Sequence, residues 1–144
     1  MSELYSISEV AKKLDLNPHT LRYYERAGLL LAVHRTQGNA RRYSPEAIEL
    51  IKLLLKLRAT GMSIAQMKIY TDLIPGGEAT IPQRIEIFQE HRNNLNAQIE
   101  SLEHCRDIVD AKLETYNQGI SMTQIDHPTI QKLIKLLNKS SEQQ

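Results

Sequence analysis

The chain of 144 residues contains a single cysteine, Cys105, so covalent cross-links contribute little to its fold. One cysteine cannot form an internal disulfide or a cysteine-rich zinc site, and the fold must rest on packing. The sequence has no uninterrupted apolar run long enough to cross a bilayer, and its first residues lack the basic-then-apolar order of a secretory signal. These absences predict a soluble, cytoplasmic protein with no membrane partner.

Positive and negative side chains are nearly equal in number, and the formal net charge is only +1. The two halves differ, however. Residues 1–74 hold eleven Lys/Arg and seven Asp/Glu, which is net +4, and residues 75–144 hold seven and ten, which is net −3. The basic half is the candidate for a polyanionic partner, although a chance imbalance of a few charges is the simple alternative.

The first half carries the signals of two short helices. Ser6 followed by Glu9 is a capping box, after which apolar residues recur with helical spacing. Asn17 can cap a second helix that has Pro18 at its first position and ends at Gly28. Two short helices joined by so brief a turn predict a helix-turn-helix.

The second helix has an outer face of polar and aromatic side chains that a core does not need: His19, Thr20, Arg22, Tyr23 and Arg26. In a major groove, Arg22 and Thr20 would lie near base edges and the tyrosine hydroxyls on phosphate oxygens. The alternative is a solvated helix whose aromatic rings pack sideways, as at least one of the two adjacent tyrosines is expected to do. A carboxylate facing DNA would be repelled, so Glu25 is expected to form a structural hydrogen bond or ion pair.

The following residues predict a hairpin and two further helices. Leu31–Arg35 and Ala40–Tyr43 have the length of short strands, and Gln37-Gly38-Asn39 supplies the turn of this small β-wing. Ser44 caps a third helix that runs to Gly61, and a second capping box starts a fourth. The wing side chains suited to gripping phosphates are Arg35, Arg41, Arg42 and Tyr43. The leucines of the third helix are explained more simply as core than as a ligand pocket: Leu53, Leu54, Leu55 and Leu57.

Four motifs in this order resemble the MerR family of transcriptional regulators over residues 4 to about 74: "RYYE", "GLL", "ARRYS" and "LRATGMSI". The resemblance implies that the side chains facing operator DNA are Thr20, Arg22 and Tyr23 of the second helix and Arg41, Arg42 and Tyr43 of the wing. It also implies a second wing from Arg58 to Ser63, where Ser63 backbone amides at a helix start could hold a phosphate. The predicted DNA-binding residues are Asn17, His19, Thr20, Arg22, Tyr23, Arg26, Arg35, Arg41, Arg42, Tyr43, Arg58 and Ser63.

The second half contains one long series of apolar residues with 4,3 spacing, broken only by Arg92 and Arg106: Ile81, Ile85, Phe88, Leu95, Ile99, Leu102, Val109, Leu113, Tyr116 and Ile120. A seam this regular cannot be buried against so small a domain, so a helix of about 55 Å is predicted to pair with a second copy. The alternative is an intramolecular hairpin broken near residues 92–96. The family resemblance favours an antiparallel coiled coil between subunits.

The predicted fold is therefore mainly α, in three parts. Residues 1–74 form a winged helix-turn-helix domain, residues 75–119 a linker and a dimerisation helix, and residues 120–144 a short tail helix. The tail helix begins near Pro128 and has an apolar stripe that should pack onto the dimer helix or the partner. One helix cannot enclose a drug-sized ligand, which speaks against the multidrug-sensing branch of the family.

The effector stays open. Metal-sensing relatives place a cysteine where this chain has Thr80 and Ile81, so no metal site is predicted. The "LRATGM" motif and short tail look more like the branch that responds to aldehydes and other electrophiles, a stress response. Its usual cysteine position holds Lys56 here. Cys105 could replace that thiol if it were exposed and its thiolate were favoured by Arg106, but a half-buried packing residue beside the seam is the favoured interpretation.

The sequence predicts a dimeric regulator that binds a pseudo-palindromic promoter operator. As the resemblance implies, it would distort the promoter spacer so that RNA polymerase can align both promoter elements. The alternative is a helical scaffold whose basic half binds an acidic protein surface, but a scaffold has no use for the "RTQGNARRY" wing. No catalytic motif or phosphate loop rises above scattered residues, so neither an enzyme nor a cofactor is predicted.

Overall fold

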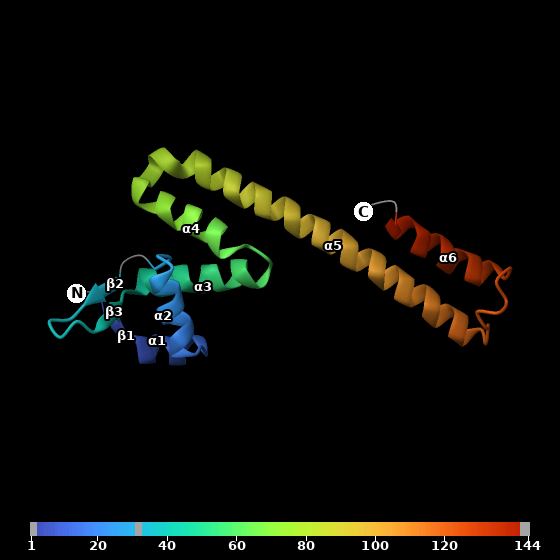
Figure 1. The fold of residues 1–144 in the computed structure, drawn as a ribbon, viewed down its shortest axis with the longest axis horizontal. Coiled ribbons are helices and arrows are strands. Elements are labelled where there is room, and N and C mark those ends of the chain that lie inside the picture. Colours follow the sequence, from blue (N-terminus) through green and yellow to red (C-terminus); the bar gives the residue numbers. More distant parts are fainter. Residues whose placement is uncertain (1–2, 31–32, 142–144) are drawn as a thin grey trace. The chain divides into compact units, whose positions relative to one another are not determined.

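The computed structural model describes residues 3–30 and 33–141 and contains six α-helices within those ranges (Figure 1). The elements in chain order are β1 (Tyr5–Ser6), α1 (Ile7–Leu14), α2 (Pro18–Arg26), β2 (Val33–Arg35), β3 (Arg41–Tyr43), α3 (Pro45–Ala59), α4 (Ile64–Leu73), the 3-10 helix η1 (Ile74–Thr80), α5 (Ile81–Asn117) and α6 (Pro128–Ser141). They form two compact units, residues 1–91 and 92–144. The mainly helical architecture with a small wing, a long helix and a short last helix confirms the predicted fold class.

Side-chain caps set the starts of the first four helices at the predicted positions. Ser6 accepts a hydrogen bond from a first-turn amide of α1, Asn17 does so in α2, and Ser44 in α3. Ser63 and Gln66 form a complete capping box at α4. Each cap satisfies amides that have no partner within the helix, which explains why these helix starts were readable from sequence.

The wing is a three-stranded antiparallel sheet in the order β1-β3-β2, whereas the sequence predicted only two strands. The missed strand β1 pairs Tyr5 with Tyr43 and Ser6 with Arg42. Two residues are too few to show an alternating pattern, so only the tertiary structure reveals β1. Two residues of the predicted first wing strand, Leu31 and Ala32, lie outside the described residues.

The core of the first unit consists of two adjoining apolar clusters. One joins α1, α2, β3 and the start of α3, and the other joins the end of α2, α3 and α4. Ile87 and Phe88 of α5 pack against the second cluster. Leu54 and Leu57 are buried as predicted, but Leu53 is 36% exposed, which corrects its assignment to the core. Leu55 is half-buried and packs against both clusters. Successive helix positions are rotated by about 100°, so three consecutive leucines cannot all face the core, and Leu53 is the one turned toward solvent.

In the second unit, α6 runs back along the C-terminal part of α5 (Figure 1). The Lys132 ammonium lies 3.5 Å from the Glu114 carboxylate, and the Thr129 hydroxyl donates to Gln118 at 2.9 Å. Because α5 is continuous from Ile81 to Asn117, the alternative of a hairpin broken near residues 92–96 is wrong. The expected packing of the tail helix onto the long helix is confirmed.

No helix within the described ranges has both the length and the apolar composition needed to span a membrane.

Candidate nucleic-acid interface

Helix α2 presents a polar face outward and an apolar face inward. Leu21 is fully buried and Tyr24 is 5% exposed, whereas Tyr23 is 48% exposed. This confirms that one of the two adjacent tyrosines packs into the core. Of the predicted contact residues of α2, Thr20 is half-buried and the others are exposed: His19, Arg22, Tyr23 and Arg26.

Asn17 is also exposed, and its Oδ1 accepts a hydrogen bond from the His19 amide at 2.9 Å. The side chain therefore already has a capping role at the start of α2. Asn17 lies at the N-terminal end of the outward face of α2, two residues before the exposed His19.

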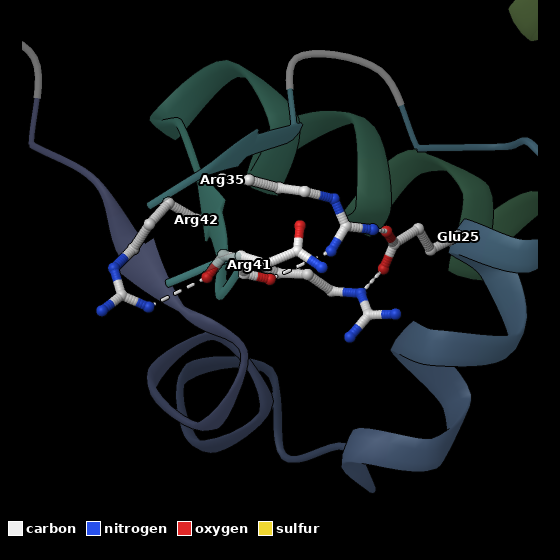
Figure 2. Close-up of polar contacts among 5 residues, drawn as sticks. Glu25, Arg35, Arg41 and Arg42 are labelled. Atoms are coloured by element: carbon white, nitrogen blue, oxygen red, sulfur yellow. Dashed lines mark hydrogen bonds and ion pairs between the residues drawn. The ribbon is translucent and has the colours of Figure 1, made fainter. Parts of the chain in front are cut away.

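The wing arginines lie on different faces of the sheet. Side chains alternate along a strand, so Arg41 and Tyr43 of β3 share one face while Arg42 lies on the other. Arg35 is directly opposite Arg41 across the β2–β3 pair. In Figure 2 the Arg42 guanidinium points away from Glu25, and its Nη1 donates to the Arg41 carbonyl at 3.0 Å.

Glu25 joins α2 to the wing through two arginines (Figure 2). Arg35 Nη2 donates to Glu25 Oε1 at 2.6 Å, and Arg41 Nε pairs with Glu25 Oε2. Arg35 also donates from Nη1 to the Asn39 carbonyl in the hairpin turn, at 3.2 Å. The structure thus confirms the expected ion pair of Glu25 and shows that it has two cationic partners.

Tyr43 is not available to DNA in this structure, which corrects its prediction as a contact residue. Its side chain is 0% exposed and belongs to the first core cluster. Burial raises the pKa of its hydroxyl, while the guanidinium groups of Arg41, Arg35 and Arg22 act in the opposite direction. Tyr43 therefore packs the wing onto the core of the first unit. In the sequence it is an aromatic residue next to two arginines, and this context does not indicate that it is buried.

Replacing Tyr43 by Phe should leave DNA affinity unchanged, because the hydroxyl is buried and has no hydrogen-bond partner among the described residues. The hydroxyl pKa is raised in the folded chain, so its stability contribution is intact below pH about 10 and falls as the pH rises through the folded-state value. Tyr43→Phe should therefore unfold less readily at alkaline pH than the unaltered chain. Thermal unfolding at neutral and alkaline pH measures this, and weaker DNA binding by the variant would restore Tyr43 as a contact.

The predicted second wing connects α3 to α4. Arg58 donates from Nη1 to the Met62 carbonyl at 3.4 Å. Burial is the main cause that raises the pKa of Tyr24, and the Arg58 guanidinium lowers it by a smaller amount, which places Arg58 near α2. The Ser63 amide, predicted to hold a phosphate, donates to Gln66 Oε1 at 3.0 Å. A phosphate at this position would have to replace the Gln66 side chain.

Sequence reasoning missed one polar contact behind the second wing. His91 of α5 is 7% exposed, and its Nε2 lies 2.9 Å from the Thr60 hydroxyl at the end of α3. The pair ties the beginning of the long helix to the segment that follows α3. A single histidine inside a helical stretch carries no signal that would identify this partner.

Cys105 is exposed in the single chain, so the half-buried environment expected for it would need a neighbouring molecule. Within residues 3–30 and 33–141, no group of three or more His, Cys, Asp or Glu side chains is arranged to hold a metal ion.

Family models and a solved structure match most of this chain. A family model described as "MerR HTH family regulatory protein" matches residues 5–73, and a second, described as "MerR, DNA binding", matches residues 48–112. The crystal structure of HiNmlR, described as a MerR family regulator lacking the sensor domain and bound to promoter DNA, is similar with a TM-score of 0.72. It is 30% identical, and the match covers 81% of this chain and 92% of HiNmlR. The chain belongs to the MerR family.

Two relatives from Bacillus subtilis (strain 168) are also similar to this MerR-family chain. The HTH-type transcriptional regulator AdhR is 38% identical over 90 residues, which are 62% of this chain and 64% of AdhR. The uncharacterized HTH-type transcriptional regulator YyaN is 33% identical over 125 residues and matches 78% of this chain and 91% of YyaN. The two family models together match residues 5–112, so the MerR-type region extends from the winged helix-turn-helix into the long helix.

Proposed function

We propose that this MerR-family transcriptional regulator works as a homodimer in which each subunit grips one half of a pseudo-palindromic promoter operator. The observation that carries the proposal is the exposed face of α2 beside a wing that Glu25 joins to the same helix. A helix in the major groove with a hairpin beside it contacts bases and phosphates together. A scaffold would need neither element.

The proposed contacts divide by chemistry. Arg22 and Thr20 of α2 form hydrogen bonds to base edges, and the hydroxyl of the exposed Tyr23 donates a hydrogen bond to a phosphate oxygen. The arginines of the wing and of the second wing bind the phosphates of the DNA backbone electrostatically. The complete proposed interface consists of Asn17, His19, Thr20, Arg22, Tyr23, Arg26, Arg35, Arg41, Arg42, Arg58 and Ser63.

The proposed dimer uses the apolar seam of α5, which the second unit leaves open. Leu102 is 70% exposed, Tyr116 is 68% exposed, and Val109 and Leu113 are also exposed. Ala111, buried at 4% exposure, lies two residues from both Val109 and Leu113, about 200° round the helix. Helix α6 thus covers a different side of α5. The part of the seam from Ile99 to Tyr116 remains free for a second copy in an antiparallel coiled coil, whereas Phe88 already packs against the core of the first unit.

We extend the proposal to the level of transcription. HiNmlR was crystallised on promoter DNA, and by similarity the dimer of this chain binds promoter DNA and distorts its spacer for RNA polymerase. Such a regulator acts where the chromosome is, in the cytoplasm, and needs no catalysis of its own. In this proposal residues 1–74 bind DNA, residues 75–119 link and dimerise the subunits, and residues 120–144 support the long helix.

The experiment that tests the proposal is a gel shift with a duplex from the protein's own promoter region against a scrambled duplex of equal length. We expect preferential binding of the promoter duplex and an affinity that falls steeply as salt rises, because phosphate contacts release counterions. Sedimentation should show a dimer. A monomer that is indifferent to both duplexes at low salt would remove the proposed function.

Replacing Arg42 by Ala should weaken binding to promoter and scrambled duplexes by the same factor, because this arginine makes a backbone contact. Removal of one phosphate contact should reduce the slope of log K against log salt by about 0.9. Titrations at several salt concentrations measure the slope. A loss confined to the promoter duplex would instead assign Arg42 to base recognition.

A further inference from the structure

Glu25 places a negative charge between two cations that the proposed interface offers to DNA phosphates. Its side chain is 15% exposed, compared with 42% for Arg35 and 29% for Arg41. The carboxylate is therefore largely covered, and both of its oxygens are directed to guanidinium groups (Figure 2). A partly covered ion pair that uses both carboxylate oxygens is screened less by solvent than an exposed pair.

The two arginines need such a partner because of the sheet register. Arg35 and Arg41 are directly opposite each other on β2 and β3, where like charges destabilise a strand pair. Glu25 lies on α2, outside the sheet, so the carboxylate that relieves this repulsion also attaches the wing to α2. Arg35 extends the connection to the turn through the Asn39 carbonyl.

We propose that Glu25 is a positioning residue for sequence recognition, which holds the wing at one place beside α2 and withholds cationic charge from the DNA backbone. The inference rests on the proposed DNA-binding function. The group of Glu25, Arg35 and Arg41 has a net charge of +1 instead of +2. Sequence-independent attraction to phosphates is reduced accordingly, and the wing reaches the backbone only where α2 is seated correctly in the groove.

The first test replaces Glu25 by Gln, which keeps the shape of the side chain and removes its charge. We expect tighter binding to scrambled duplex and a salt slope steeper by about 0.9 for each additional phosphate that the freed arginines neutralise. The ratio of promoter to scrambled affinity should fall about tenfold, within the discrimination of one good base contact. Glu49→Gln is the matched control, because Glu49 is an exposed carboxylate on α3 that pairs only with Lys52 among the described residues.

A double variant separates charge from position. Glu25→Gln with Arg35→Gln leaves Arg41 as the sole charge of the group, so the net charge is +1 as in the unaltered protein. We expect its salt slope to return to the unaltered value while the affinity ratio stays low, because the wing is no longer tied to α2. If the ratio recovers together with the slope, Glu25 acts by charge alone and the positioning role is wrong.

The remaining outcomes also decide the proposal. If Glu25→Gln behaves as Glu49→Gln does, or weakens binding to both duplexes equally, the proposal fails. If Glu25→Gln does not fold, Arg35→Gln is tested alone, because it removes the ion pair between Arg35 and Glu25. We expect this variant to lower the ratio of promoter to scrambled affinity and to flatten the salt slope. An unchanged ratio would overturn the positioning role. The unaltered protein is measured first, and absence of promoter preference there would reject the underlying function instead.

Discussion

Leu102→Glu should convert the dimer into monomers and abolish stable operator binding. Leu102 is 70% exposed in the single chain and lies in the middle of the seam. Full burial of a leucine contributes roughly 1.5–3 kcal/mol, and a two-fold dimer loses two such side chains. The dimer dissociation constant should rise by roughly 10²- to 10⁴-fold, before the cost of burying two carboxylates is added.

Analytical ultracentrifugation over a range of protein concentrations measures this change. Ser101→Glu is the control, because Ser101 is an exposed residue of the same helix outside the 4,3 series and receives the same charge. It should remain dimeric. If Leu102→Glu remains as dimeric as Ser101→Glu, the assignment of the seam to the dimer interface is wrong.

Arg22→Ala should weaken promoter binding by roughly 1–3 kcal/mol per contact and reduce the preference for promoter over scrambled DNA. Arg22 is exposed on the outward face of α2, where a guanidinium can form two hydrogen bonds to one guanine. Binding to scrambled DNA should change much less, because the remaining arginines still provide the backbone contacts.

Footprinting and competition titrations measure the loss of preference. Lys52→Ala removes one cation from the exposed surface of α3, where Lys52 pairs with Glu49, and should leave the preference unchanged. An Arg22→Ala variant that keeps the footprint and affinity ratio of the unaltered protein would show that Arg22 does not read bases.

The helices were predictable because their signals are local. Ser44 accepts a hydrogen bond from the Ala47 amide, and Pro45 suits the first helical position because its own nitrogen carries no hydrogen. Ser63 and Gln66 form a capping box, so sequence alone places both helix starts. The seam was equally readable, because a 4,3 repeat sustained over a long helix is typical of a coiled coil. Strand β1 was not, since its partner β3 is distant in sequence and two residues make no pattern.

The candidate site also contains features that the sequence predicts and features that it does not. The polar face of α2 and the wing hairpin followed from residue types and spacing, and the family resemblance implied that both face operator DNA. The sequence could not distinguish Tyr43 from Tyr23, although one is fully buried and the other is 48% exposed. It also could not show that Glu25 has both Arg35 and Arg41 as partners, because strand register and helix placement decide which charges meet.

By itself, the sequence determined the helix starts, the family, the outward face of α2 and the apolar seam of α5, because each is encoded by residues close together in the chain. Only the tertiary structure decided which tyrosines are buried, which wing arginines are already paired and which side of α5 is covered by α6. Those outcomes depend on packing between distant segments. Burial and pairing are properties of the space around a side chain and not of its neighbours in sequence.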